Sequence, residues 1–376
     1  MAERVGGHTG TLTNARIVLP DGVTSGALHI DGGLIAESST GETVDLDGRY
    51  VVPGFVDMHV HGGAGASYQS GRAEEARRAA LFHLAHGTTT TIASLVTGTS
   101  DELANAVTAL ADLAAEGLIA GVHLEGPYLA RDRCGAHDPA LLRDPDRAEF
   151  ARLVRLGAGH VRMITLAPEL PGALDLVRDA ADAGVIAAVG HTDAPGDTAR
   201  AAFDAGATVA THLFNAMRPL HHREGGPVAA ALNDPRVTAE LINDGVHVEA
   251  AVARLALAAA PGRVALITDA MAAAGMGDGD YRLGVMDVQV RDGRATLAGG
   301  ASIAGSTITM ADAFRRAVTR LGTPIEEAAA AASLVPARAL GLGSRVGSLE
   351  AGKDADLVVL NDDMSVHRVM KGGRWS

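Results

Sequence analysis

The segment PGFVDMHVHG, residues 53–62, carries a short apolar run into two histidines, His59 and His61. Seven similar runs follow along the chain, and most of the stretches between them are Ala-rich and long enough for a helix. The eight runs predict strands over residues 54–59, 88–95, 120–125, 161–167, 185–190, 208–211, 237–242 and 264–268. Eight strand–helix units over roughly 280 residues are typical of an α/β protein with a TIM (β/α)8 barrel, whose active-site face lies at the carboxyl ends of the strands.

A doubly wound open sheet is the alternative α/β fold. It would carry a G-x-G-x-x-G turn after its first strand or a phosphate-binding P-loop, and the sequence shows neither. We therefore predict the barrel, over residues 53–344. The Gly-rich segment Gly275–Ser306 has a hairpin signal at Arg291-Asp292-Gly293 and is expected to be an excursion after the eighth strand.

The two ends of the chain resemble one another. Residues 1–52 and 345–376 both contain short alternating runs broken by turn residues, with Asp-Gly turns in the first of them. We expect the two segments to form one small β-sandwich domain, with the barrel inserted between them.

Composition excludes several classes of protein. The 376 residues carry a formal net charge of −13, which argues against a nucleic-acid or anionic-membrane partner. Apolar runs fall short of the ~18 residues of a spanning helix, and the first residues lack the apolar core of a signal peptide. The one cysteine, Cys134, excludes an intrachain disulfide and is expected to be a free surface thiol. A cytoplasmic protein is therefore predicted.

Metal-binding side chains stand where the predicted strands end. They are His59 and His61 on the first, Glu125 on the third, His191 on the fifth, His212 on the sixth and Asp269 on the eighth. Because the strand ends meet at one mouth, these groups should converge on Zn²⁺ or a similar divalent ion. Such an ion lowers the pKa of a bound water toward ~7 and creates hydroxide at neutral pH.

Two ions would need a bridging anion. The only lysines, Lys353 and Lys371, lie outside the barrel, so a carboxylated lysine is excluded and Glu125 is the natural bridge. Asp269 is the candidate general base and then acid. His123 lies one layer deeper than Glu125, and we expect it to pack or to support a ligand rather than bind metal.

Several motifs resemble those of the amidohydrolase superfamily and, more narrowly, of its N-acetylglucosamine-6-phosphate deacetylases. The superfamily motif is PGFVDMHVHG, and the more specific ones are HLEGPY (123–128), THLFNAM (211–217) and DGVH (244–247), accompanied by GHTDA (190–194) and TDAM (268–271). The resemblance covers nearly the whole chain. It implies hydrolysis of the acetamide of N-acetylglucosamine 6-phosphate to acetate and glucosamine 6-phosphate, by attack of metal-bound hydroxide on the carbonyl.

The resemblance also implies roles for individual residues. Glu125, His191 and His212 match the principal metal ligands, His59 and His61 a second-metal motif, and Asp269 the catalytic acid/base. One or two ions are implied, with Zn the first expectation and Fe, Mn, Co or Cd possible. His247 matches the residue that polarises the acetamide carbonyl. The other implied substrate contacts are Ala136, His137, Asn215, Ala216, Arg223, Asp244, Gly245, Val246, Ile303, Ala304 and Gly305.

Phosphate recognition is implied in a particular form. In the family, the arginine that matches Arg223 reaches the phosphate bound by the neighbouring subunit, so a homodimer is expected. Independently of the resemblance, Arg218-Pro-Leu-His221-His222-Arg223 is the densest basic cluster near the predicted mouth, and arginine suits phosphate. In the GHTDA motif, Asp193 stands where many members carry a small amide.

Two other functions stay open at this point. A deaminase or cyclic-amide hydrolase could use the same metal ligands, but a neutral nucleobase would need no phosphate contact such as Arg223. A non-catalytic scaffold with a retained barrel would typically lose its ligands, whereas this sequence keeps all of them.

Overall fold

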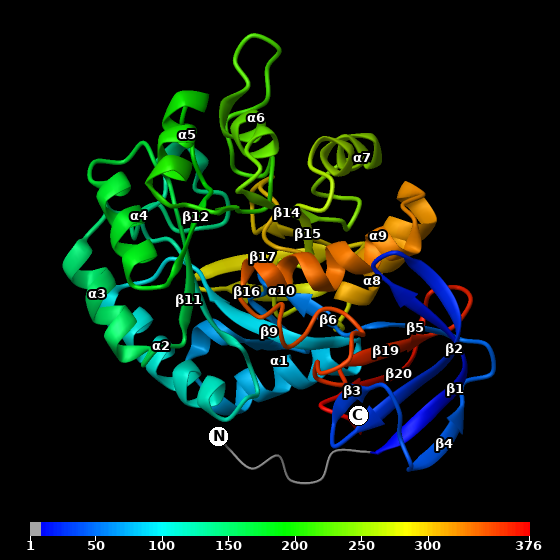
Figure 1. The fold of residues 1–376 in the computed structure, drawn as a ribbon. Helices are drawn as coiled ribbons and strands as arrows, with labels where there is room; N and C mark the ends of the chain where they lie inside the picture. The colour runs from blue at the N-terminus through cyan, green and yellow to red at the C-terminus, as the bar shows by residue number, and fades with distance from the viewer. Residues whose placement is uncertain (1–8) are drawn as a thin grey trace. The chain divides into compact units, whose positions relative to one another are not determined.

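The computed structural model describes residues 9–376, which divide into two compact units (Figure 1). One unit contains the described residues up to Asp57, together with His83–Thr90 and Met310–Ser376. The other contains Met58–Phe82 and Thr91–Thr309. Residues 1–8 of the predicted 1–52 segment lie outside the described part. The domain boundaries predicted at 52/53 and 344/345 stay proposals.

Eight strands form the barrel sheet, in the order β15-β14-β13-β12-β11-β10-β9-β6. Every pairing from β9 to β15 is parallel. The strands are β6 (Phe55–Asp57), β9 (Thr88–Leu95), β10 (Gly121–Glu125), β11 (Val161–Leu166), β12 (Ile186–Val189), β13 (Val209–Ala210), β14 (Thr238–Ile242) and β15 (Val264–Ile267). Each lies within its predicted range, so the nearly closed parallel barrel is confirmed.

Helices alternate with these strands. They are α1 (Ala73–Ala85), α2 (Ser100–Ala115), α3 (Arg147–Leu156), α4 (Ala173–Asp182), α5 (Gly196–Ala205), α6 (Gly226–Asn233) and α7 (Ala250–Ala259), with 3₁₀ turns at Tyr68–Ser70 and Arg131–Arg133. In Figure 1, α2 to α5 lie on the outside of the strands. Helix α2 shows why: Thr99 caps its start, and Leu103, Val107 and Leu110 form a buried stripe at helical spacing.

The predicted excursion is a three-stranded antiparallel sheet. Its strands are β16 (Gly279–Leu283), β17 (Met286–Arg291) and β18 (Arg294–Leu297), and the last two join through the predicted Asp292-Gly293 turn. Val96, Met271, Leu283 and Val288 form the small apolar cluster that packs this sheet against the strand ends. A two-stranded pair, β7 (Gly62–Gly63) with β8 (Ala66–Ser67), follows the first histidines.

The two ends of the chain share one sheet, so the prediction that they form a single small β domain is confirmed. Its order is β21-β20-β19-β5-β1-β2-β3, with β4 paired to β1. Residues Leu12, Ile30, Val51 and Leu357 lie in its core. The strands are β1 (Gly10–Leu19), β2 (Gly22–Asp31), β3 (Leu34–Ala36), β4 (Glu42–Asp45), β5 (Tyr50–Pro53), β19 (Leu357–Leu360), β20 (Val366–Lys371) and β21 (Arg374–Trp375).

The same unit contains three short helices. They are α8 (Met310–Arg316), α9 (Ile325–Ala329) and α10 (Val335–Ala339), with π-helical turns at Ala317–Leu321 and Ala330–Leu334. Across residues 9–376, no helix combines the length and the apolar character needed to cross a membrane.

Candidate active site with two metal-binding groups

The predicted ligands lie at the carboxyl ends of the barrel strands. His59 and His61 follow β6, Glu125 is the last residue of β10, and Asp269 comes two residues after β15. His191 and His212 come two residues after β12 and β13. His191, His212 and Asp269 adopt left-handed backbone, with φ of 47°, 26° and 49°. A non-glycine residue pays about 1–3 kcal/mol for that conformation, and such strain gathers at functional sites.

Two groups of three side chains result. In the first, Glu125 Oε1 lies 3.1 Å from His191 Nε2 and 3.0 Å from His212 Nε2, and the two imidazole nitrogens are 3.0 Å apart. In the second, His61 Nε2 lies 3.2 Å from His59 Nε2 and 3.1 Å from Asp269 Oδ1. All six side chains are buried.

Glu125 faces both groups. Its Oε1 lies 3.4 Å from His59 Nε2, and its Oε2 lies 3.2 Å from His61 Nε2. Each group therefore has one oxygen of the same carboxylate within reach. This is the placement that a bridging ligand needs.

The donor set fits a divalent ion. Zinc binds imidazole nitrogen and carboxylate oxygen at about 2.0–2.2 Å, so tetrahedral ligands lie about 3.3 Å from one another. The spacings within both groups are close to that value. Without a cation or a proton between them, imidazole nitrogens about 3 Å apart would face one another with no attraction, so the geometry is that of a cation site.

The outward nitrogen of three histidines is held by the protein. Nδ1 of His59 donates to Glu240 Oε2 at 3.0 Å, that of His61 to the carbonyl of Ser94 at 3.2 Å, and that of His191 to the carbonyl of Arg133 at 2.8 Å. Each bond turns Nε2 toward the site, which is how supporting contacts orient metal ligands.

Sequence reasoning missed Glu240. It is fully buried on β14 and also accepts from the backbone N–H of His212 at 3.1 Å, so it supports one ligand from each group. A single acidic residue inside the apolar run 237–242 was the available signal. His123 is fully buried behind the ligands, between Ser94 Oγ at 2.9 Å and Thr165 Oγ1 at 2.8 Å.

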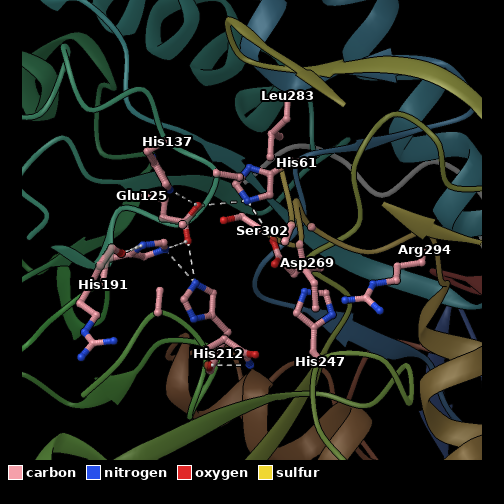
Figure 2. Close-up of a pocket in the computed structure, with 18 of the residues that line it drawn as sticks. His61, Glu125, His137, His191, His212, His247, Asp269, Leu283, Arg294 and Ser302 are labelled. Atoms are coloured by element: carbon pink, nitrogen blue, oxygen red, sulfur yellow. Dashed lines mark hydrogen bonds and ion pairs between the residues drawn. The ribbon is translucent and has the colours of Figure 1, made fainter. Parts of the chain in front are cut away.

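A pocket of about 400 Å³ opens over the two groups (Figure 2). The predicted site residues that line it are His61, Glu125, Ala136, His137, His191, His212, Asn215, Ala216, His247, Asp269, Ile303 and Gly305. The excursion adds Leu283, Arg294 and Ser302, which sequence reasoning did not single out. Figure 2 shows Arg294 on the same side of the pocket as His247 and Asp269.

Other predicted contacts lie outside the described lining of this pocket. Asp244 stands behind His247, where its Oδ2 accepts from Nδ1 at 2.7 Å. Val246 is exposed, and Ala304 is fully buried. The lining does not include Arg223 either; its guanidinium donates to His222 Nε2 at 2.7 Å. Cys134 is a free, half-buried thiol.

The amidohydrolase family model matches residues 50–376. The chain belongs to the amidohydrolase family. An N-acetylgalactosamine-6-phosphate deacetylase of Escherichia coli O157:H7 is 36% identical over 92% of this chain and 93% of the relative. An N-acetylglucosamine-6-phosphate deacetylase of Bos taurus is 35% identical over 96% of this chain and 94% of the relative.

A solved structure is more similar still. It is a mutant N-acetyl-D-glucosamine-6-phosphate deacetylase from Mycobacterium smegmatis in complex with N-acetyl-D-glucosamine-6-phosphate. The two chains are 46% identical, with a TM-score of 0.94 over 98% of this chain and 99% of that one. As an amidohydrolase, the present chain is a metal-dependent hydrolase, and its two metal-binding groups agree with that membership.

Charge in this amidohydrolase site is balanced by protons in the absence of metal. Burial opposes a charge on His59, but the carboxylates of Glu125 and Glu240 outweigh it and hold its pKa well above 6.5. Burial also opposes a charge on His61, but Asp269 and Glu125 outweigh it and raise the pKa of His61 to about 9. Burial would raise the pKa of Asp269, but His61 and His59 lower it to about 2.

Metal binding should therefore displace protons. The metal-free protein holds protons on His59 and His61 at neutral pH, whereas imidazole binds a metal ion in its neutral form. We expect Zn²⁺ to release protons at about pH 7 and fewer above the His61 pKa of about 9, with zinc affinity rising over that range. Titration calorimetry in two buffers of different ionisation enthalpy counts the protons released.

The raised pKa of His61 also predicts how the stability of the metal-free protein depends on pH. A histidine pKa raised above its unfolded value of 6.5 stabilises the metal-free fold below that pH, and this contribution disappears as the pH rises through about 9. The free energy of unfolding of metal-free protein should fall over that interval, and the zinc-loaded protein serves as the control. Zinc uptake at neutral pH without proton release would contradict the assignment of protons to His59 and His61 in the metal-free protein.

Proposed function

We propose that this chain hydrolyses the acetamide of N-acetylglucosamine 6-phosphate to acetate and glucosamine 6-phosphate. The observation that carries the proposal is a single pocket into which Glu125, His191, His212, Asp269 and His247 all face. The similarity to deacetylases of acetylated hexosamine phosphates over nearly the whole chain supports the same substrate class.

Glu125, His191 and His212 would hold the principal ion, and His59, His61 and Asp269 a second one. Zinc is the first expectation because imidazole and carboxylate ligands at this spacing suit it, while Fe, Mn, Co and Cd share the ligand preference in part. The ion supplies a water that is activated near neutral pH. The remaining chemistry belongs to side chains of this protein.

Asp269 is assigned the proton transfers. Its low pKa keeps the carboxylate ionised, its Oδ1 lies 3.1 Å from His61 Nε2, and the residue lines the pocket. It takes a proton from the attacking water as the new C–O bond forms. It then returns that proton to the amide nitrogen as the C–N bond breaks, so that the amine leaves neutral.

Two histidines are placed to donate to the acetamide carbonyl. His247 is held by Asp244 through Nδ1, and its Nε2 edge faces the pocket. His137 accepts at Nδ1 from the backbone N–H of Thr97 at 3.2 Å, so Nε2 carries its proton, 3.3 Å from Glu125 Oε2. Because the His137 proton is already engaged by Glu125, we assign polarisation of the carbonyl to His247 and substrate contact to His137.

Phosphate recognition is assigned to Arg223 of a neighbouring subunit in a homodimer. Arg223 belongs to the loop that leads into α6, and this loop projects away from the strands (Figure 1). Its guanidinium has no carboxylate partner among residues 9–376 and does not line the pocket of its own subunit. An arginine without a carboxylate partner, on a projecting loop, is suited to a phosphate held by another copy. The remaining substrate contacts are assigned to Ala136, Asn215, Ala216, the 244–246 loop and Ile303–Gly305.

Acetate release tests the proposal. Metal-reconstituted protein is compared on N-acetylglucosamine 6-phosphate, N-acetylgalactosamine 6-phosphate and free N-acetylglucosamine, with a chelated sample as the control. We expect fast, metal-dependent release of acetate from N-acetylglucosamine 6-phosphate and little from free N-acetylglucosamine. Release from N-acetylgalactosamine 6-phosphate alone would make that sugar the substrate instead. No release from any of them, with metal bound, would overturn it in favour of a deaminase or cyclic-amide hydrolase.

Replacing Asp269 separates chemistry from binding of the principal ion, to which Asp269 is not a ligand. We expect Asp269→Asn to lower kcat by about 10²–10⁴-fold, the usual contribution of a positioned acid/base. The ion held by Glu125, His191 and His212 should remain, as measured by metal analysis of the purified variant. Near-normal turnover with the principal ion bound would remove Asp269 from the proton-transfer role.

The two histidine donors are separable by kinetics. Loss of the group that stabilises the developing oxyanion costs about 10²–10³-fold in kcat. We expect that loss for His247→Asn, and mainly a raised KM for His137→Asn. The opposite pattern in steady-state assays would transfer the polarising role to His137.

Arg223 can be tested across the subunit boundary. A charged hydrogen bond is worth about 1.5–3 kcal/mol, so Arg223→Ala should raise KM for the phosphorylated sugar by roughly 10–100-fold. The control is Arg200→Ala, an exposed arginine on α5. Mixing Arg223→Ala subunits with Asp269→Asn subunits should restore a low KM, because the mixed dimer contains one complete site. No recovery in dimers shown to have exchanged would place Arg223 outside the partner's site.

A further inference from the structure

Asp193 lies two residues after His191, between two arginines. Arg133 approaches Asp193 Oδ1 through Nε at 2.8 Å and Nη2 at 2.6 Å, and Arg218 approaches Oδ2 through Nη2 at 3.1 Å. None of these contacts is used by the proposed reaction. The carboxylate therefore joins two loops that leave different barrel strands.

One of these loops reaches a metal-binding residue through its backbone. Arg133 ends the 3₁₀ turn after β10, in the loop that also carries Ala136 and His137. Its carbonyl oxygen accepts from His191 Nδ1 at 2.8 Å. That bond keeps the proton on Nδ1 and leaves the lone pair of Nε2 directed at Glu125 Oε1, 3.1 Å away. The position of the Arg133 backbone thus determines how His191 faces the site.

Asp193 is itself held firmly. Its backbone N–H donates to Glu169 Oε1 at 2.6 Å, and the preceding Thr192 N–H donates to the carbonyl of Ala216 at 3.0 Å. Arg218 N–H in turn donates to the carbonyl of Thr192 at 2.9 Å. The backbone that carries the Asp193 carboxylate is therefore fixed, and the carboxylate offers Arg133 a partner from that fixed position.

We propose that Asp193 is a positioning residue, which holds Arg133 so that the Arg133 carbonyl orients His191 as a metal ligand. The inference rests on the proposed function only for the role of His191 in metal binding. Isolated surface ion pairs contribute little to stability, and the Arg133 and Asp193 side chains are 31% and 36% exposed. What distinguishes this pair is the fixed backbone of Asp193 at one end and the ligand-orienting carbonyl of Arg133 at the other.

Cobalt-loaded protein gives a readout that does not depend on turnover. Loss of a contact that orients a ligand usually weakens metal binding by about 10–100-fold. We expect Asp193→Ala to release Co²⁺ to a chelator at least about tenfold faster than the parent protein and to change the visible absorption spectrum of the bound ion. Asp193→Asn, whose amide oxygen still accepts one arginine, should lie between the two.

Two further variants make the test specific. Asp197→Ala removes an exposed carboxylate four residues along the chain, where it pairs with Arg200, and should leave metal release unchanged. If Asp193 acts through Arg133, the Arg133→Gln/Asp193→Ala double variant should release metal no faster than the more affected single variant.

An unchanged release rate and spectrum in folded Asp193→Ala would overturn the proposal, as would fully additive effects in the double variant. Circular dichroism establishes folding, and Asp193→Asn carries the test if the alanine variant does not fold. Failure of the parent protein to deacetylate the proposed sugar would count against the substrate, because metal release is measured without it.

Discussion

The structure of the site depends on one buried carboxylate, that of Glu125. Moving a carboxylate out of water costs several kcal/mol unless positive charge and hydrogen bonds compensate. Here the compensation comes from the imidazoles that turn a protonated nitrogen toward it, those of His59, His61 and His137, each with Nε2 within 3.4 Å of a Glu125 oxygen. With metal absent, protons on His59 and His61 supply the positive charge. When metal binds, the ion takes their place, so the barrel mouth contains a cation in both states.

Much of this was predictable because barrel geometry turns sequence spacing into position. An apolar run followed by His or Glu marks a strand end, and parallel strands bring their ends to one face. From the sequence alone, that reasoning brings together the six predicted ligands His59, His61, Glu125, His191, His212 and Asp269. It depends on the fold class alone, which an uninterrupted series of strand–helix units shows clearly.

The contacts that orient those ligands could not be predicted in the same way. Glu240 is one acidic residue within an apolar strand, and sequence alone does not show which neighbour it faces. The supporting group for His191 is a backbone carbonyl, that of Arg133, which any residue type could supply. The excursion over Gly275–Ser306 is also predictable only in part. Its hairpin follows from Asp292-Gly293, whereas its position over the pocket follows from apolar packing around Met271 and Leu283.

The barrel mouth favours a bound phosphate only near arginines that lack a carboxylate partner. A net charge of −13 repels an anion overall, so recognition requires arginines that remain uncompensated. Arg133 and Arg218 are compensated. Asp193 pairs with Arg133, and both Asp193 and Glu224 pair with Arg218. Within the part of the chain that the structure describes, Arg294 and Arg223 have no carboxylate partner, and only Arg294 lines its own pocket. The arginines that hold the loops in place and those free to meet a substrate are therefore different residues, and a change in substrate charge need not disturb the positions of the metal ligands.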